Sequence, residues 1–183
     1  LNYQRVKDRL CADIPYERLE EIYREKTSFA CTASFSSLLF YQRRSLRRGG
    51  FFMRAPLDAE ADRTDLAWAV LADIACSTHE QLQHLVELTG NEGGPILGCG
   101  GGFQSEALCQ MLSDLSGREL RLRAGFRQAT VQGLVTLCND YLGEVPAKRD
   151  SALKTYHPRT GQLIHQYAPA WREARDRAND IKA

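Results

Sequence analysis

The sequence lacks features that would place it in several broad classes of protein. No apolar run reaches the roughly 18 residues that a membrane-spanning helix needs, so we expect no membrane partner. The formal net charge is only +1, which argues against nucleic acid as the main partner. The basic run at residues 43–48 is a local exception, and we interpret it as a solvated loop rather than a polyanion site.

Cysteines and histidines at metal-binding spacing are missing as well. The six cysteines are Cys11, Cys31, Cys76, Cys99, Cys109 and Cys138, and no two of them form a C-x-x-C pair. This excludes a zinc knuckle and a thioredoxin motif, and it predicts reduced thiols in a cytoplasmic protein. His79 and His84 stand five apart, whereas two ligands on one helix face need a spacing of three or four. We therefore expect no metal site and interpret both histidines as solvent-facing.

The composition is otherwise that of an ordinary globular protein, with 43% hydrophobic and 26% charged residues among 183. That length suits one domain with a sizeable core, or one domain with an appendage. We expect a leading region of a helix and strands at residues 1–63 and a main domain at residues 64–183. The absence of an initiator methionine favours a piece of a longer polypeptide.

Hydrophobic periodicity predicts helices and strands that alternate along the chain. The first half is expected to hold a helix at residues 16–26, one or two strands within 28–41, a loop at 43–50, a strand at 51–55 and a long helix at 64–88 capped by Thr64. The second half is expected to hold a strand near a sheet edge at residues 119–123, a helix at 127–142, a linker at 143–150 and a helix at 162–182 that Pro169 kinks or delays. The inward face of the helix at 127–142 would comprise Val131, Leu134, Val135, Cys138 and Leu142. This alternation implies an α/β layer with at least one parallel pair of strands.

A glycine-rich turn between residues 98 and 102 is the centre of the chain's organisation. Ile96 and Leu97 before it form a short apolar run that is typical of a buried strand. After it, Leu108, Met111, Leu112 and Leu115 recur at helical spacing, and Gly117 follows where a helix cap is expected. A strand, a bare turn and a helix bring backbone N–H groups and the positive end of the helix together, which suits an anion such as phosphate.

The turn does not match the two commonest phosphate-binding motifs. No Lys-Ser or Lys-Thr pair follows the glycines, so the segment is not a Walker A loop. No third glycine completes a G-x-G-x-x-G pattern that starts at Gly98 or Gly100. From spacing alone, a tight turn that holds no ligand stays open as an alternative.

The segment from Gly100 to Asp114 resembles the GGGSQN-x-LLNQL-x-AD segment of the FGGY carbohydrate kinases, most closely in the rhamnulokinase branch. The segment from Ala124 to Gly133 resembles the AGPVEATALG segment of that branch. The helix before the glycine turn and the aromatic segments around Tyr156 and Tyr167 agree in order with the family. The resemblance extends from about residue 65 to about residue 178, and it rests mainly on the first two segments.

This resemblance implies an α/β fold of the actin-like ATPase (RNase H-like) type, with a mixed sheet flanked by helices. It also implies ATP and Mg²⁺ as cofactors and the transfer of the γ-phosphate to the hydroxyl of a sugar substrate, with a ketose such as L-rhamnulose favoured. The nucleotide-binding residues that it implies are Gly100, Gly101, Gly102, Phe103, Gln104 and Ser105.

Three positions depart from the family pattern. Ser105 stands where the family usually has asparagine, and serine is shorter although it can still form a hydrogen bond. Phe103 replaces a small polar residue, and its ring could stack on adenine or fill the turn. Gln128 replaces the glutamate of E-A-T, so one charge is lost.

The residues that perform the chemistry are not found in this chain. Phosphoryl transfer to a hydroxyl needs a base, usually an aspartate. Asp62, Asp65, Asp73 and Asp114 do not fit that role, so we expect no catalytic residue here. The base and most sugar contacts would lie in a missing N-terminal kinase domain. Two alternative functions stay open: a pseudokinase or interaction module with the same fold, and an unrelated α/β phosphate binder. A homodimer stays open as the oligomeric state.

Overall fold

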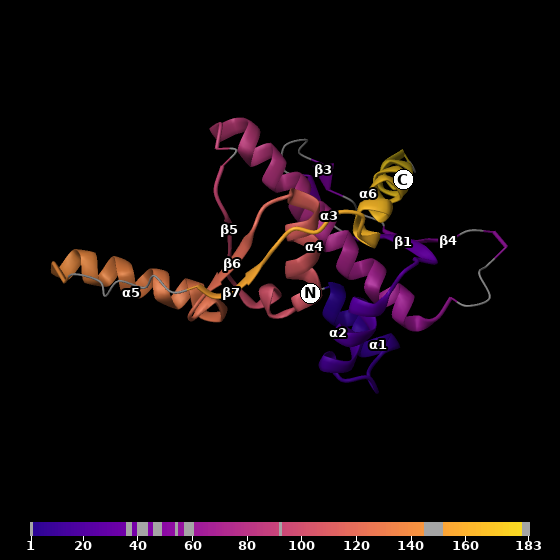
Figure 1. Ribbon diagram of the computed structural model, residues 1–183, viewed down its shortest axis with the longest axis horizontal. Coiled ribbons are helices and arrows are strands. Elements are labelled where there is room, and N and C mark those ends of the chain that lie inside the picture. Colours follow the sequence, from indigo (N-terminus) through magenta and orange to yellow (C-terminus); the bar gives the residue numbers. More distant parts are fainter. Residues whose placement is uncertain are drawn as a thin grey trace. The chain divides into compact units, whose positions relative to one another are not determined.

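The computed structural model describes most of the chain, which forms two compact units (Figure 1). The described residues are 2–35, 38–39, 44–45, 49–53, 55–56, 61–91, 93–144 and 152–180. Unit 1 comprises Leu1–Glu92 and Arg159–Ala183, and unit 2 comprises Gly93–Pro158. The expected boundary between residues 63 and 64 stays a prediction, and it falls after the first residue of a helix inside unit 1.

Unit 1 begins with two helices, α1 (Asn2–Leu10) and α2 (Tyr16–Glu25). The predicted helix at residues 16–26 is thereby confirmed, and its apolar side is buried at Leu19 and Tyr23. The hydroxyl groups of Tyr3 and Tyr23 lie 3.2 Å apart, which connects the two helices. Burial raises the pKa of Tyr3 to about 12, so this phenol stays neutral at physiological pH.

Two antiparallel strand pairs follow. β1 (Cys31–Ser34) pairs with β4 (Gly50–Met53), with Cys31 opposite Met53 and Ser34 opposite Gly50. β2 (Leu38–Leu39) pairs with β3 (Arg44–Ser45). The strands expected within residues 28–41 and at 51–55 are therefore confirmed. The loop expected at residues 43–50 contains β3, and most of its other residues lie outside the described part of the chain.

The long helix α3 (Arg63–Thr89) is confirmed, but its cap is not Thr64. The Asp62 carboxylate accepts hydrogen bonds from the N–H groups of Thr64 and Asp65, and the Asp65 carboxylate accepts one from the N–H of Asp62. Such a reciprocal pair satisfies N–H groups that the first turn leaves without partners, and a carboxylate also suits the positive end of the helix. Gly90 ends the helix in a left-handed conformation.

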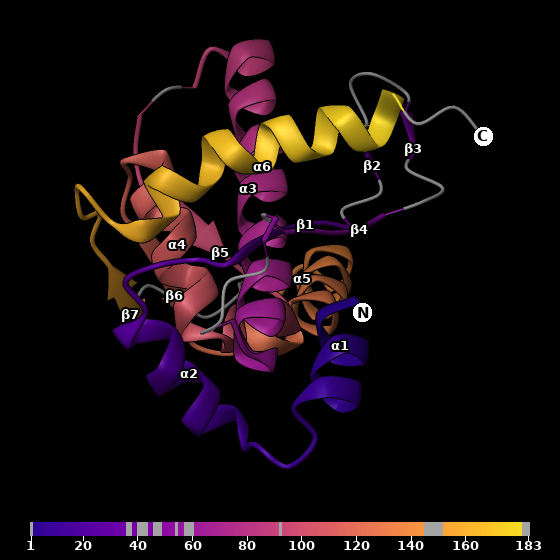
Figure 2. The same cartoon turned by 90° about the vertical axis from the view of Figure 1, so that its right-hand side faces the viewer.

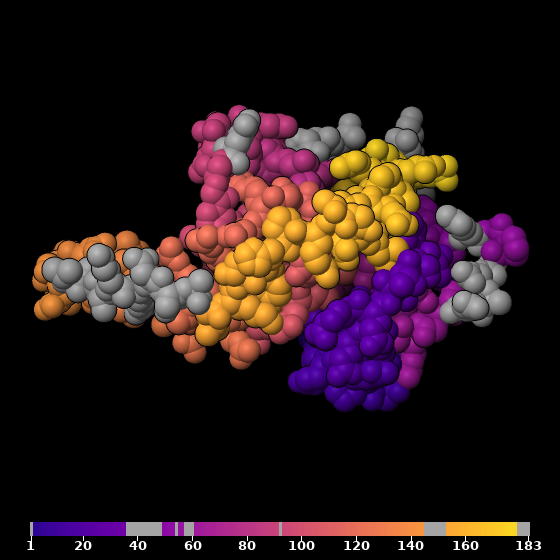
Figure 3. Space-filling model, in the orientation of Figure 1, coloured from indigo at the N-terminus to yellow at the C-terminus, as the bar shows by residue number. Residues whose placement is uncertain are grey.

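The last helix, α6 (Leu163–Asp180), lies against β1 and α3 in unit 1 (Figures 2 and 3). The hydroxyl of Tyr167 accepts a hydrogen bond from the N–H of Ala33 and donates one to the carbonyl of Ala69, both at 3.0 Å. The expected start after Ala168 is wrong, because α6 begins at Leu163 and runs through Pro169, whereas the expected kink stays a prediction. Pro169 is exposed, and Tyr167 and Trp171 on either side of it are buried, so packing holds the helix together across the missing N–H.

Unit 2 contains a three-stranded sheet in the order β5 (Ile96–Gly98), β6 (Leu120–Arg123) and β7 (Ala152–Tyr156). β5 and β6 are parallel, with Ile96 opposite Leu120 and Gly98 opposite Leu122, which confirms the expected parallel pair. β7 runs antiparallel to β6 and was not predicted. The strand expected at a sheet edge is therefore the central one.

Helix α4 (Glu106–Ser116) covers one face of this sheet (Figure 1). Leu120 and Leu122 of β6 are buried, whereas the alternate residues Arg121 and Arg123 are exposed on the other face. The hydroxyl of Ser113 on α4 donates toward the carbonyl oxygens of Arg118 and Tyr156, at 2.8 and 3.0 Å. The carboxyl end of α4 is thus fixed to the strands at the end of the sheet opposite the glycine-rich turn.

Helix α5 (Ala129–Leu142) confirms the helix expected at residues 127–142 but not its burial. None of its residues is buried, and the residues expected to face inward are exposed: Val131, Leu134, Val135, Cys138 and Leu142. A Cβ on Gly133 would meet no atom within 4 Å, so no close approach accounts for that glycine. Across the described residues, no helix is long and apolar enough to cross a membrane.

Candidate functional site

The carboxyl ends of the parallel strands β5 and β6 bring the two family-like segments together. The glycine-rich turn follows β5 at Gly98, and the segment that resembles AGPVEATALG follows β6 at Arg123. The N–H of Gly100 donates a 2.7 Å hydrogen bond to the carbonyl of Phe126, which links the two segments directly. In open α/β sheets, ligands bind outside the carboxyl ends of parallel strands. This edge of the sheet is therefore the candidate site.

The turn needs glycine at two positions for different reasons. A Cβ on Gly98 would lie 2.7 Å from Cδ2 of Leu122 and 2.8 Å from Cδ1 of Phe103, so a side chain fits there only if these neighbours shift. Gly100 has φ of 101° and ψ of 168°, a conformation that is essentially restricted to glycine. The Phe103 ring packs over Gly98 and so fills the turn. Whether that ring also stacks on adenine stays a prediction.

All six predicted nucleotide-binding residues lie within this single turn. Gly101 and Gly102 are exposed in a short 3-10 helix, η2 (Gly101–Gln104), and the Gln104 side chain is exposed beside them. The Ser105 hydroxyl accepts a 3.2 Å hydrogen bond from the N–H of Leu108, so Ser105 caps α4. This cap is a structural role that the resemblance did not imply, and it engages the same oxygen that would reach a nucleotide.

The charge around the turn is positive. Residues 95–105 and 120–139 contain no aspartate or glutamate. Glu106 in the first turn of α4 lies 2.5 Å from Nζ of Lys154, so its charge is balanced. On β6, Arg121 is already paired at 2.7 Å with Glu119, and this hydrogen bond lowers the pKa of Glu119. Arg123 and Arg127 are exposed near this edge and form no ion pair with the part of the chain that the structure describes.

Sequence reasoning missed the contribution of the short helix η3 (Phe126–Gln128). The carbonyl of Gly125 accepts a 3.0 Å hydrogen bond from the side-chain amide of Gln132, which holds the start of α5 against this segment. The guanidinium of Arg127 lies 5.8 Å from the centre of the Phe126 ring. The sequence signal that could have found Arg127 is the absence of acidic residues around it.

The aspartates that were rejected as catalytic bases have structural roles. Asp73 is 1% exposed and accepts hydrogen bonds from Nε1 of Trp171 at 2.7 Å and from the N–H of Phe35 at 3.0 Å. Asp114 is buried and accepts a 2.8 Å hydrogen bond from the side chain of Gln110. Among the described residues, no group of three or more His, Cys, Asp or Glu side chains could hold a metal ion.

The interpretation of both histidines as solvent-facing is wrong for His79. Its side chain lies on the buried side of α3, and its Nδ1 has no hydrogen-bond partner in the described structure. Burial, with a smaller contribution from the charge of Arg172, lowers the pKa of His79. His84 is partly exposed and lies 3.5 Å from Glu87. The sequence could not show that α6 covers one of the two positions.

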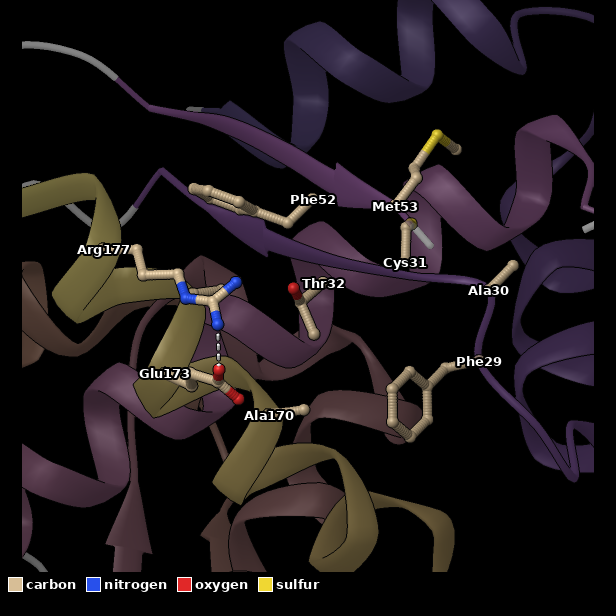
Figure 4. Close-up of a pocket in the computed structure, with 10 residues that line it drawn as sticks. Phe29, Ala30, Cys31, Thr32, Phe52, Met53, Ala170, Glu173 and Arg177 are labelled. Atoms are coloured by element: carbon tan, nitrogen blue, oxygen red, sulfur yellow. Dashed lines mark hydrogen bonds and ion pairs between the residues drawn. The ribbon is translucent and has the colours of Figure 1, made fainter. Parts of the chain in front are cut away.

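Unit 1 contains a hollow of about 250 Å³ between the β1–β4 pair and α6 (Figure 4). Its walls include Phe29 and Phe52, and Glu173 and Arg177 form an ion pair at 2.5 Å on the helix side. Burial raises the pKa of the Cys31 thiol to about 12, so the thiol in the lining is protonated and unreactive at neutral pH. This hollow therefore carries no evident chemistry.

Comparison with known proteins decides the family. The family model for the C-terminal domain of the FGGY family of carbohydrate kinases matches residues 18–139. The chain belongs to the FGGY family of carbohydrate kinases. A Bacillus subtilis (strain 168) protein described as a sugar kinase, YoaC, is 32% identical over 175 residues, which cover 94% of this chain and 36% of that protein.

Solved structures of FGGY kinases confirm the actin-like ATPase fold. Plasmodium falciparum glycerol kinase with ADP matches with a TM-score of 0.71 at 19% identity, over 93% of this chain and 35% of that chain. Ligand-bound xylulose kinase from Lactobacillus acidophilus matches with a TM-score of 0.71 at 16% identity, over 98% of this chain and 38% of that chain. The chain thus spans little more than a third of these relatives. Its place in the rhamnulokinase branch stays a prediction.

Proposed function

We propose that this chain is the ATP-binding C-terminal portion of a carbohydrate kinase that transfers the γ-phosphate of ATP to a sugar hydroxyl. The observation that supports this most directly is the hydrogen bond between Gly100 and Phe126. This bond joins the glycine-rich turn to the segment after β6, at the carboxyl end of a parallel strand pair, where ligands bind in open α/β sheets. The members of the family are carbohydrate kinases. The glycerol kinase of similar fold was solved with ADP.

The residues of the turn suit the phosphate side of a nucleotide. Gly101 and Gly102 leave the backbone accessible, and α4 directs the positive end of its helix dipole toward the same place. Gln104 supplies an exposed amide that can donate to phosphate or accept from the base. The neutral and cationic side chains here do not form a Mg²⁺ site, so we propose that Mg²⁺ enters already bound to the nucleotide phosphates.

The remainder of the chemistry requires groups outside this chain. Among the described residues, no aspartate near the turn is placed to accept a proton from a sugar hydroxyl, because Asp114 on α4 is buried and bonded to Gln110. We propose that the base and most sugar contacts belong to an N-terminal kinase domain of the parent polypeptide. A ketose such as L-rhamnulose is the substrate that the sequence favours.

Calorimetric titration of the chain with ADP and with ATP and Mg²⁺ tests the nucleotide site. We expect dissociation constants in the millimolar range or tighter. Gly101→Asp places a carboxylate in the turn at a position with ordinary backbone angles, and it should abolish binding. Gly93→Asp is the matched control, because it adds the same charge at the amino end of β5 in open space. Absence of nucleotide binding by the unmodified chain would contradict the proposal and favour a non-catalytic relative.

A further inference from the structure

Arg127 occupies the candidate site but is absent from the segment that the chain resembles. The pattern AGPVEATALG has valine and glutamate where this chain has Arg127 and Gln128. Replacement of valine by arginine adds one positive charge, and replacement of glutamate by glutamine removes one negative charge. The segment is therefore two charge units more positive than the pattern.

The position of this added charge is set by the backbone of its neighbour. The carbonyl of Phe126 accepts the 2.7 Å hydrogen bond from Gly100, and Arg127 is the next residue along the chain. Its guanidinium lies over the Phe126 ring, 5.8 Å from the ring centre, within the range in which a cation is attracted to an aromatic face. Arg127 is thus held next to the glycine-rich turn although its side chain is exposed.

No acidic group of the described residues neutralises Arg127. It forms no ion pair, the stretches on both sides of the site contain no acidic residue, and Glu106 is engaged by Lys154. An exposed guanidinium with five donors and a fixed planar shape is suited to two parallel hydrogen bonds with phosphate oxygens. The hydroxyl of Ser105, in contrast, is already used to cap α4.

We infer that Arg127 binds the phosphate tail of the nucleotide in this chain, a contact that rests on the proposed function and that the resembled segment cannot make with valine. The charge of Arg127 thus provides a contact to the nucleotide in place of Ser105, whose side chain is shorter than asparagine and whose hydroxyl already caps α4. Binding should consequently depend on the number of phosphates more than on the base.

Nucleotide titrations of Arg127→Gln against the unmodified chain test this inference. We expect the affinity for ATP and ADP to fall about tenfold or more, as the loss of a charge-assisted pair requires, while the affinity for adenosine stays the same. Arg127→Lys keeps the charge without the planar fork and should give an intermediate loss. Affinity for ATP should also fall less steeply with added salt in Arg127→Gln than in the unmodified chain.

Arg123→Gln is the matched control, because Arg123 is an exposed arginine on the preceding strand that also forms no ion pair in the described structure. We expect Arg123→Gln to change the affinity for ATP by about twofold or less, because an exposed charge that does not touch the phosphates is largely screened by salt. Equal ATP affinity in Arg127→Gln and the unmodified chain would overturn the inference while leaving the nucleotide site intact. Equal losses for ATP and adenosine, or equal losses in both arginine variants, would overturn it as well. Failure of the unmodified chain to bind any nucleotide would contradict the proposed function instead.

Discussion

At the scale of single residues, Gly98 shows how the turn excludes a side chain. Its missing Cβ leaves room for both Leu122 and the Phe103 ring, which would otherwise lie under 3 Å away. Gly98→Ala should lower the free energy of unfolding by about 1–3 kcal/mol, because the neighbours must shift to admit the methyl group. Urea denaturation followed by circular dichroism measures this. Gly101→Ala is the control, with only the end of the Gln104 side chain nearby at 3.6 Å, and it should change stability little.

His79 gives unit 1 a dependence on pH. Its pKa is lowered in the folded chain, so the unfolded chain binds the proton more readily. The stabilisation that neutral His79 provides is present above its unfolded pKa of about 6.5 and is lost as pH falls through that value and below. The charge of Arg172 opposes protonation of His79. Glu80, the next residue after His79, forms ion pairs with Arg172 and Arg175.

Denaturation of His79→Phe between pH 5 and pH 8 tests this assignment. The variant should lose part of the decrease in stability that the unmodified chain shows toward pH 5. His84→Phe should keep that decrease, since His84 is partly exposed and near Glu87. An identical pH profile in His79→Phe and the unmodified chain would refute the role of His79.

At the scale of elements, the sequence predicted the local order well and the burial of helices less well. The strand, turn and helix around Gly98 were found because glycines interrupt the chain and the apolar spacing changes there. β7 was missed because it is five residues long and Leu153 within it is 64% exposed, which leaves a weak pattern. Periodicity showed which face of α5 is apolar, but it could not show whether another element covers that face.

The exposure of α5 leads to a direct mutational prediction. Leu134→Gln should change the free energy of unfolding of the described fold by about 0.5 kcal/mol or less, because Leu134 is 59% exposed. Leu112→Gln on α4 is the contrast, at 3% exposed, and should cost about 2–5 kcal/mol through lost packing and a buried amide. A large loss in Leu134→Gln, measured by urea denaturation, would mean that α5 is packed in solution.

The candidate site was likewise only partly predictable. The six residues of the turn lie next to one another because they are contiguous in sequence, and their contact with a nucleotide stays a prediction. The capping role of Ser105 depends on where α4 begins, and the proximity of Phe126 to Gly100 depends on the pairing of β5 with β6. Contacts of this kind arise from tertiary structure, so residue spacing alone does not encode them.

At the scale of the whole molecule, Asp73 connects distant parts of unit 1. It accepts hydrogen bonds from Phe35 at the end of β1 and from Trp171 on α6, 98 residues later in the chain. Asp73→Ala should lower the free energy of unfolding by about 2–4 kcal/mol, because the buried indole N–H of Trp171 and the part-buried N–H of Phe35 lose their acceptor. Thermal and urea denaturation check this. Asp13→Ala removes an exposed ion pair with Arg63 and should have little effect, so similar losses in both variants would contradict the assignment.

Unit 1 is assembled from both ends of the sequence, with the whole of unit 2 between them. During synthesis, unit 2 can acquire its strands and helix α4 as soon as they leave the ribosome, because its partners are close in sequence. Unit 1 has to wait for Tyr167 and Trp171, which follow the whole of unit 2 in the chain. Until α6 has been made, the apolar side of α3 is a surface that chaperones would recognise, and a premature stop before α6 would deliver a product marked for degradation.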